Sequence, residues 1–76
     1  MSMAFVLITA ELGREKEVVS ELKRTKGVSE AHSAYGAYDI IVKVEAPTQQ
    51  EVKDIVFSKI RMLDDVRSTL TLVVVE

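Results

Sequence analysis

The chain is 76 residues long, 47% hydrophobic and free of cysteine, and its ten Lys and Arg residues oppose twelve Asp and Glu residues. This length predicts one domain, and the missing cysteine excludes disulfide frameworks, thiolate metal sites and thiol nucleophiles. The net charge of −2 argues against a phosphate-binding surface for nucleic acid. No apolar run approaches the ~20 residues that span a bilayer, and the first residues lack the features of a secretory signal. We therefore expect a cytoplasmic domain with no direct nucleic-acid or membrane contact.

The first half of the chain predicts a strand, a helix and a second strand. Residues 3–10 (MAFVLITA) form a short apolar run rich in β-branched and aromatic side chains, which is typical of a strand. After a glycine, residues 14–26 combine strong helix formers with an apolar stripe at helical spacing, and Gly27 suits the end of that helix. Residues 28–35 are more polar and predict a strand that Gly36 interrupts.

The second half repeats this order. Residues 38–45 (YDIIVKVE) give the clearest strand, which a proline ends. Thr48 and Glu51 predict a capping box, in which the hydroxyl accepts a hydrogen bond from a free amide and the carboxylate accepts one from the cap amide. The helix that follows is expected to run to about Met62, and residues 66–75 predict the last strand.

The order βαββαβ predicts an α+β, ferredoxin-like sandwich, with a four-stranded antiparallel sheet and both helices on one face. The last strand is apolar on both sides, with Leu70 and Leu72 on one and Val73 and Val75 on the other. Because two helices cover only one face, the other face needs a second layer. We expect a second protomer packed sheet to sheet, forming a dimeric α/β barrel with Val73, Val75 and Ile41 at the shared face.

The sequence offers little catalytic chemistry. His32 is the only histidine, and the chain offers no second histidine or cysteine for a transition-metal site and no serine at a triad spacing. The adjacent pair Asp64 and Asp65 is more typical of a turn than of a cation site. We predict a protein that is not an enzyme and uses no cofactor or metal. A small dimeric α/β-barrel enzyme of the monooxygenase or isomerase type stays open as an alternative, with His32 and Tyr35 as its few polar groups.

One group of residues suits a small ligand. The segment 35–39 (YGAYD) combines a glycine turn, free backbone amides and an acid, and Thr69 and Thr71 place two hydroxyls on one side of the last strand. Backbone amides bind a carboxylate and an aspartate binds an ammonium, and an amino acid carries both groups. The alternative is that the glycine only makes the turn and the threonines only favour a strand.

These residues resemble the ligand-binding domain of the Lrp/AsnC regulators, also called the regulation-of-amino-acid-metabolism domain. Its pattern is roughly Gly-x-Tyr/Phe-Asp at the start of the third strand and Val-x-x-Thr-x-Thr in the fourth. The matching residues are Gly36, Tyr38, Asp39, Val66, Thr69 and Thr71. The resemblance covers essentially the whole chain. It implies a dimer built by sheet-to-sheet packing, further assembly into octamers or related rings, and small effectors, typically amino acids, bound between dimers near the Gly-x-Tyr-Asp turn.

The resemblance implies a function for residues 1–76 as a stand-alone effector-binding and oligomerisation domain, since the family's helix-turn-helix has no room in this chain. Such a domain would bind an amino acid or similar metabolite and modulate full-length regulators by co-assembly. The expected ligand-binding residues are Gly36, Ala37, Tyr38, Asp39, Thr69 and Thr71. In this arrangement the amides of residues 36–38 hold the carboxylate, Asp39 holds the ammonium and the threonines contact the remainder. The alternative for Asp39 is a structural role, in which it accepts hydrogen bonds from backbone amides at the turn. Ala37 stands where the family often has an acidic or polar residue. A ligand-free assembly domain is the second alternative.

Overall fold

Strands and helices follow the chain in the predicted order in the computed structural model, which describes residues 1–75. The elements are β1 (Ser2–Ala10), α1 (Glu15–Lys23), β2 (Val28–Ser33), β3 (Ile40–Ala46), α2 (Gln49–Ile55), η1 (Val56–Ile60) and β4 (Val66–Val74). The π-helical turn η1 directly continues α2, so the two form one helix that reaches almost to the predicted end. No helix in this part of the chain is long and apolar enough to cross a membrane.

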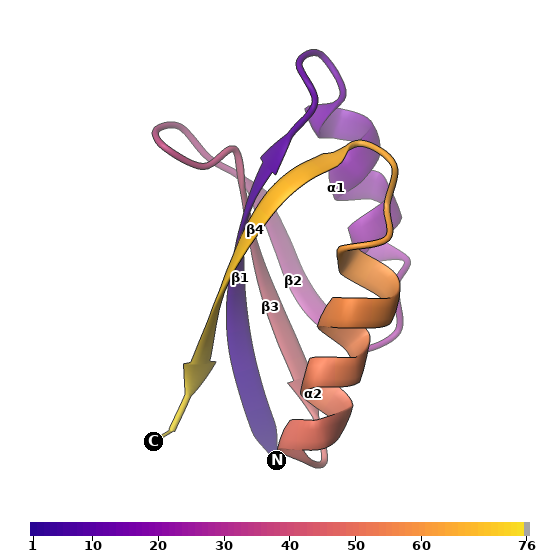
Figure 1. Ribbon diagram of the computed structural model, residues 1–76, viewed down its shortest axis with the longest axis vertical. Helices are drawn as coiled ribbons and strands as arrows, with labels where there is room; N and C mark the ends of the chain where they lie inside the picture. The colour runs from indigo at the N-terminus through magenta and orange to yellow at the C-terminus, as the bar shows by residue number, and fades with distance from the viewer. Residues whose placement is uncertain (76) are drawn as a thin grey trace.

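The four strands form one sheet in the order β2-β3-β1-β4, and every neighbouring pair is antiparallel. Figure 1 shows α1 and the α2–η1 helix side by side on the same face of this sheet, while the other face is open. This is the ferredoxin-like sandwich that the sequence predicts. The register places Val6 of β1 directly opposite Val42 of β3 and Thr71 of β4, so these three side chains share one face.

The helix ends follow from local hydrogen bonds. The Thr48 hydroxyl oxygen accepts a hydrogen bond from the amide of Glu51 at 3.2 Å, which confirms half of the predicted capping box. The reciprocal bond from the Thr48 amide to the Glu51 carboxylate is not formed within residues 1–75. Helix α1 ends at Lys23, before the predicted residue 26, because Arg24 and Thr25 donate to carbonyls three residues back and tighten the last turn.

The connection between β2 and β3 is longer than predicted, because β2 ends at Ser33 and β3 begins at Ile40. The cause is a set of backbone bonds that sequence periodicity does not reveal. The amide of Ala34 donates to the carbonyl of Asp39 at 2.7 Å, and the amide of Asp39 donates across to the carbonyl of Ile8 in β1 at 2.9 Å. Residues 34–39 therefore form a closed loop anchored on β1.

The core lies between the helices and one face of the sheet. Alternate residues of β1 and β3 point into it, and helix residues fill it from the other side. The fully buried residues of this core are Ala4, Val6, Ile8, Leu22, Ile40, Val42, Val44 and Ile60. Val18, Val52 and Val56 complete the helix contribution.

The opposite face of the sheet, the open face, is also apolar. Leu7 of β1 lies opposite both Ile41 and Leu70, and Phe5 lies opposite Leu72. Exposed fractions are 37% for Ile41, 43% for Leu70 and 49% for Leu72. The expectation that Val73 shares this face with Ile41 was wrong. Val73 lies opposite Ala4, which is buried under the helices, so Val73 belongs to the helix side.

Candidate functional site

The β2–β3 loop projects from the sheet at the end away from the chain termini (Figure 1). Tyr35, at its tip, is fully exposed. Gly36 has a φ of +123°, a backbone conformation that residues with a Cβ rarely adopt, although a Cβ there would meet no atom within 4 Å. Glycine is therefore needed here for the backbone conformation and not for space, and residues 35–37 around it are exposed.

Asp39 is fixed at the base of this loop by three bonds to the rest of the fold. Its amide and carbonyl make the loop-closing bonds described above, and its carboxylate Oδ2 accepts a hydrogen bond from the amide of Ala10 at 3.2 Å. The other carboxylate oxygen, Oδ1, makes no hydrogen bond within residues 1–75. Asp39 therefore joins the loop to the end of β1, and its Oδ1 has no hydrogen-bond partner among the described residues.

Thr69 and Thr71 lie elsewhere. They pair with Ile8 and Val6 and so face the helix side of β4, where they line a groove between β4 and the α2–η1 helix. We call this the α2–β4 groove. Its volume of about 620 Å³ lies in the range of small-molecule sites. Its other wall includes Lys53, Phe57 and Arg61 from the helix.

One chain does not bring the six predicted site residues together. Asp39 lines a second depression with Tyr35 and Glu15 at one end of the molecule, whereas Thr69 and Thr71 line the α2–β4 groove. Strand β1 lies between β3 and β4 in the sheet and separates the two groups. A single ligand therefore contacts both groups only if they come from different chains.

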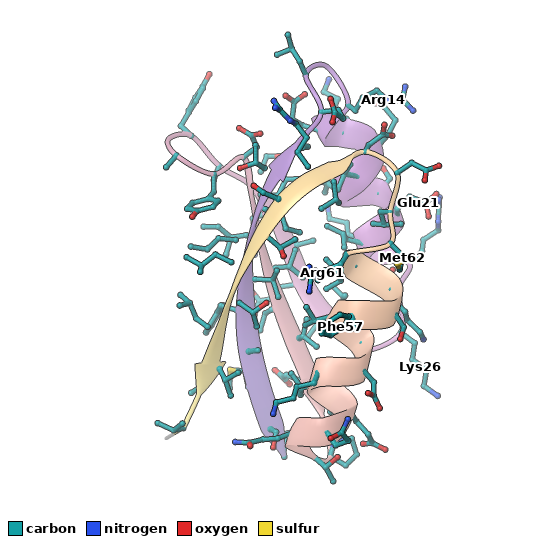
Figure 2. All side chains as sticks on the ribbon, in the orientation of Figure 1. Arg14, Glu21, Lys26, Phe57, Arg61 and Met62 are labelled. Atoms are coloured by element: carbon teal, nitrogen blue, oxygen red, sulfur yellow. The ribbon has the colours of Figure 1, made fainter. Side chains whose placement is uncertain are left out.

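Sequence reasoning missed the polar and aromatic residues of the α2–β4 groove. Phe57 is 64% exposed, and the guanidinium carbon of Arg61 lies 4.7 Å from the centre of its ring. Figure 2 shows both side chains on the inner side of the helix, with Arg61 extending toward β4. The i,i+4 spacing of Phe57 and Arg61 was the available signal.

A charged network lies at the β2–β3 side of the open face. Glu30 contacts His32 at 3.1 Å and Lys43 at 3.6 Å, and Lys43 also contacts Glu45 at 3.2 Å. The hydrogen bond to His32, with the nearby charge of Lys43, lowers the pKa of Glu30. The hydrogen bond to Glu45 raises the pKa of Lys43. This network borders the apolar residues, since His32 lies directly opposite Ile41.

The predicted turn at Asp64 and Asp65 is present, and Asp65 accepts a hydrogen bond there from Arg14 at 3.1 Å. This bond raises the pKa of Arg14. Among residues 1–75, no group of three or more histidines and carboxylates is arranged to hold a metal ion.

The chain is thus a ferredoxin-like domain with an open apolar sheet face and a glycine–aspartate loop anchored on β1. Residues 3–76 match the Lrp/AsnC ligand binding domain, and the chain belongs to this family. The family is regulatory rather than enzymatic.

Similar proteins resemble this chain in both sequence and fold. The chain is 38% identical, over 73 residues, to an uncharacterized HTH-type transcriptional regulator of Pyrococcus furiosus, an alignment that covers 92% of this chain and 49% of the regulator. The chain thus spans about half the length of the curated relatives it matches. A hypothetical protein from Pyrococcus horikoshii superposes with a TM-score of 0.93 at 36% identity, covering 100% of this chain and 92% of that protein.

A more distant structure shares the fold alone. It is a transcriptional regulator from Neisseria meningitidis, crystallised as a complex with L-Met. Its TM-score is 0.85 at 12% identity, over 99% of this chain and 50% of the regulator.

Proposed function

We propose that this domain binds an amino acid or similarly small metabolite where protomers meet, and modulates full-length Lrp/AsnC regulators by assembling with them. Family membership supports the regulatory role, and the L-Met complex of the Neisseria regulator supports an amino acid as the type of effector. The observation that carries the proposal is Asp39, a carboxylate held beside a glycine turn with one oxygen free.

In the proposed site, the amides of residues 36–38 donate to the ligand carboxylate and the free Oδ1 of Asp39 accepts from its ammonium. Thr69 and Thr71 contact the rest of the ligand. Because these threonines lie in the α2–β4 groove, away from the loop, the site takes its loop from one protomer and its β4 from another.

Assembly through the open face accounts for the apolar residues left there. Leu7, Ile41, Leu70 and Leu72 would form the centre of a sheet-to-sheet dimer, with the charged network at its border. Such burial is the usual driving force of stable homodimers. Further assembly would bring the loop of one dimer to the groove of the next.

The substitution Asp39→Asn tests the ligand role directly. Asn keeps an acceptor oxygen for the Ala10 amide but loses the charge, so we expect the melting temperature to stay nearly constant. Affinity for an amino-acid effector should fall by about 2–4 kcal/mol, the range for truncating one partner of a charge-assisted contact. The effector is first found by melting-temperature shifts with the twenty amino acids, and affinity is then measured by calorimetry.

Asp39→Ala is the matched control, because it removes the acceptor as well and should lower both the affinity and the melting temperature. Unchanged binding by Asp39→Asn would show that the aspartate is structural only. If none of the twenty amino acids shifts the melting temperature, the proposed ligand function fails and a ligand-free assembly domain remains.

A further inference from the structure

The α2–β4 groove is locally positive in a chain that is negative overall. Among the described residues, Lys53 and Arg61 line it against one carboxylate, Asp54, whereas the whole chain carries a net charge of −2. Neither Lys53 nor Arg61 forms an ion pair within the described part of the chain, and Asp54 accepts a hydrogen bond from Gln50 at 3.0 Å. The two cations therefore have unused donors that face the groove.

The backbone of the helix positions one of these cations. The amide of Arg61 donates to the carbonyl of Val56, five residues back, at 2.9 Å, which is the wide π-helical turn of η1. Such turns are rare and occur often at functional sites. The Arg61 guanidinium lies over the Phe57 ring, and the side chain extends from the helix toward β4 (Figure 2).

The groove combines these donors with an apolar floor. The hydroxyls of Thr69 and Thr71 come from the opposite wall, and the apolar part of the lining comes from Val52 and Val56 of the helix and Val73 of β4. A group that fits this surface has a short apolar stem and an end that accepts several hydrogen bonds and carries negative charge.

We infer that the effector is an amino acid with an acidic side chain, whose second carboxylate is bound by Arg61 and Lys53. This inference rests on the proposed function, in which residues 36–39 bind the α-carboxylate and α-ammonium groups. The side chain then enters the α2–β4 groove, its methylenes pack on the valines, and its carboxylate lies among the guanidinium, the ammonium and the two hydroxyls.

The test compares each acid with the amide of the same shape. Calorimetry on the full chain at low ionic strength measures binding of L-glutamate against L-glutamine and of L-aspartate against L-asparagine. We expect one acid to bind at least about tenfold more tightly than its amide, because the amide loses the charge that the groove complements.

Arg61→Gln should abolish this preference, and Lys53→Gln should reduce it. Lys59→Gln is the matched control, since Lys59 is on the same helix but outside the α2–β4 groove, and it should leave the preference unchanged. Phe57→Leu keeps the charge and removes the stacking surface, so it should give an intermediate loss. All of these side chains are exposed, and circular dichroism checks that each variant stays folded.

The outcomes separate this inference from the proposed function. If an amino acid binds but the amide binds as tightly as the acid, or an apolar amino acid such as L-leucine binds most tightly, the acidic specificity is wrong and the effector function stands. The same holds if Arg61→Gln weakens acid and amide alike. If no amino acid binds, the proposed function itself fails, and the acidic specificity fails with it.

Discussion

The two faces of the sheet are built from the same strands and carry similar side chains, yet they meet different surroundings. On the helix side, Val6, Ile40 and Val42 have no exposed surface. On the open face, their neighbours Ile41 and Leu70 remain 37% and 43% exposed. The alternation of side chains along a strand decides which face of the sheet each one lies on. How much of that side chain is buried depends on whether another layer covers the face. A strand that is apolar on both faces therefore indicates a layer that one chain alone does not supply.

The largest expected effect comes from a charge on the helix side. Val42→Asp places a carboxylate among fully buried apolar residues with no partner, at a cost of several kcal/mol. That cost is comparable to the total stability of about 5–15 kcal/mol typical of a small domain. We expect the variant to be unfolded at 25 °C by circular dichroism, and a folded variant would contradict the assignment of this face as the core.

The same type of substitution on the open face should separate the protomers without unfolding them. Leu72 is 49% exposed in one chain, so the carboxylate of Leu72→Asp stays hydrated in the monomer but would be buried and unpaired in a sheet-to-sheet dimer. We expect a folded monomer by light scattering and circular dichroism. The wild-type chain should be at least a dimer at micromolar concentration.

Thr71→Asp is the control for this prediction, because Thr71 lies on the same strand and faces the helix side. It should leave the sheet-to-sheet dimer intact. A wild-type chain that stays monomeric, or a dimer that survives Leu72→Asp, would show that the open face is not the interface.

A smaller loss of stability is expected from a substitution at Gly27, which lies close to Ile55 of α2. Gly27 joins α1 to β2 with a φ of +98°, and a Cβ there would collide with the side chain of Ile55. Gly27→Ala should destabilise the fold by about 1–3 kcal/mol, mostly from backbone strain, because the colliding atom is the Cδ1 end of the Ile55 side chain, which can shift. Gly13→Ala is matched, since its φ is +82° with no atom within 4 Å of the added Cβ, and only the strain of about 1–2 kcal/mol remains. If urea denaturation gave the two variants an equal loss in the free energy of unfolding, packing against Ile55 would contribute nothing at Gly27.

The order and type of the elements could be predicted because their causes are local. Apolar spacing and the Thr48 cap lie within a few residues of what they determine. The end of β2 and the start of β3 could not be predicted, because they depend on the bond between Asp39 and Ile8, 31 residues apart in the chain. The face of Val73 was misassigned for a related reason: both sides of β4 are apolar, and only the pairing with Ala4 shows which side is covered.

In the candidate site, too, the features with local causes could be predicted and those that depend on distant parts of the chain could not. The glycine turn at Gly36 is a local signal, and its positive φ agrees with the prediction. The separation of Asp39 from Thr71 is not local, because it follows from the position of β1 between their strands. Phe57 and Arg61 were missed because exposed residues on a helix resemble an ordinary solvated surface until the opposite wall, β4, is known.

The smallest expected effect concerns the charged network that borders the open face. The hydrogen bond to His32 and the charge of Lys43 lower the pKa of Glu30, so its ionised form is favoured in the folded state. A carboxyl group whose pKa is lowered by folding stabilises the folded state at pH values above its ordinary pKa. This contribution is lost as the pH falls through the lowered pKa. Glu30→Gln should therefore slightly lower the melting temperature at neutral pH.

This difference should disappear in acid, below the lowered pKa of Glu30, and should shrink in 1 M NaCl, because the pairs are exposed and salt screens them. Asp64→Asn, an exposed turn carboxylate outside the ion pairs of the described residues and outside the first turn of either helix, is the control. Dimerisation through the open face would change the size of this effect. If a second protomer covers the border of the open face, solvent screening falls, and the effect of Glu30→Gln at neutral pH should grow with protein concentration as dimers form. A difference that persists undiminished in acid would mean that charge is not its source. A difference independent of concentration, in a protein shown to dimerise, would place the network outside the interface.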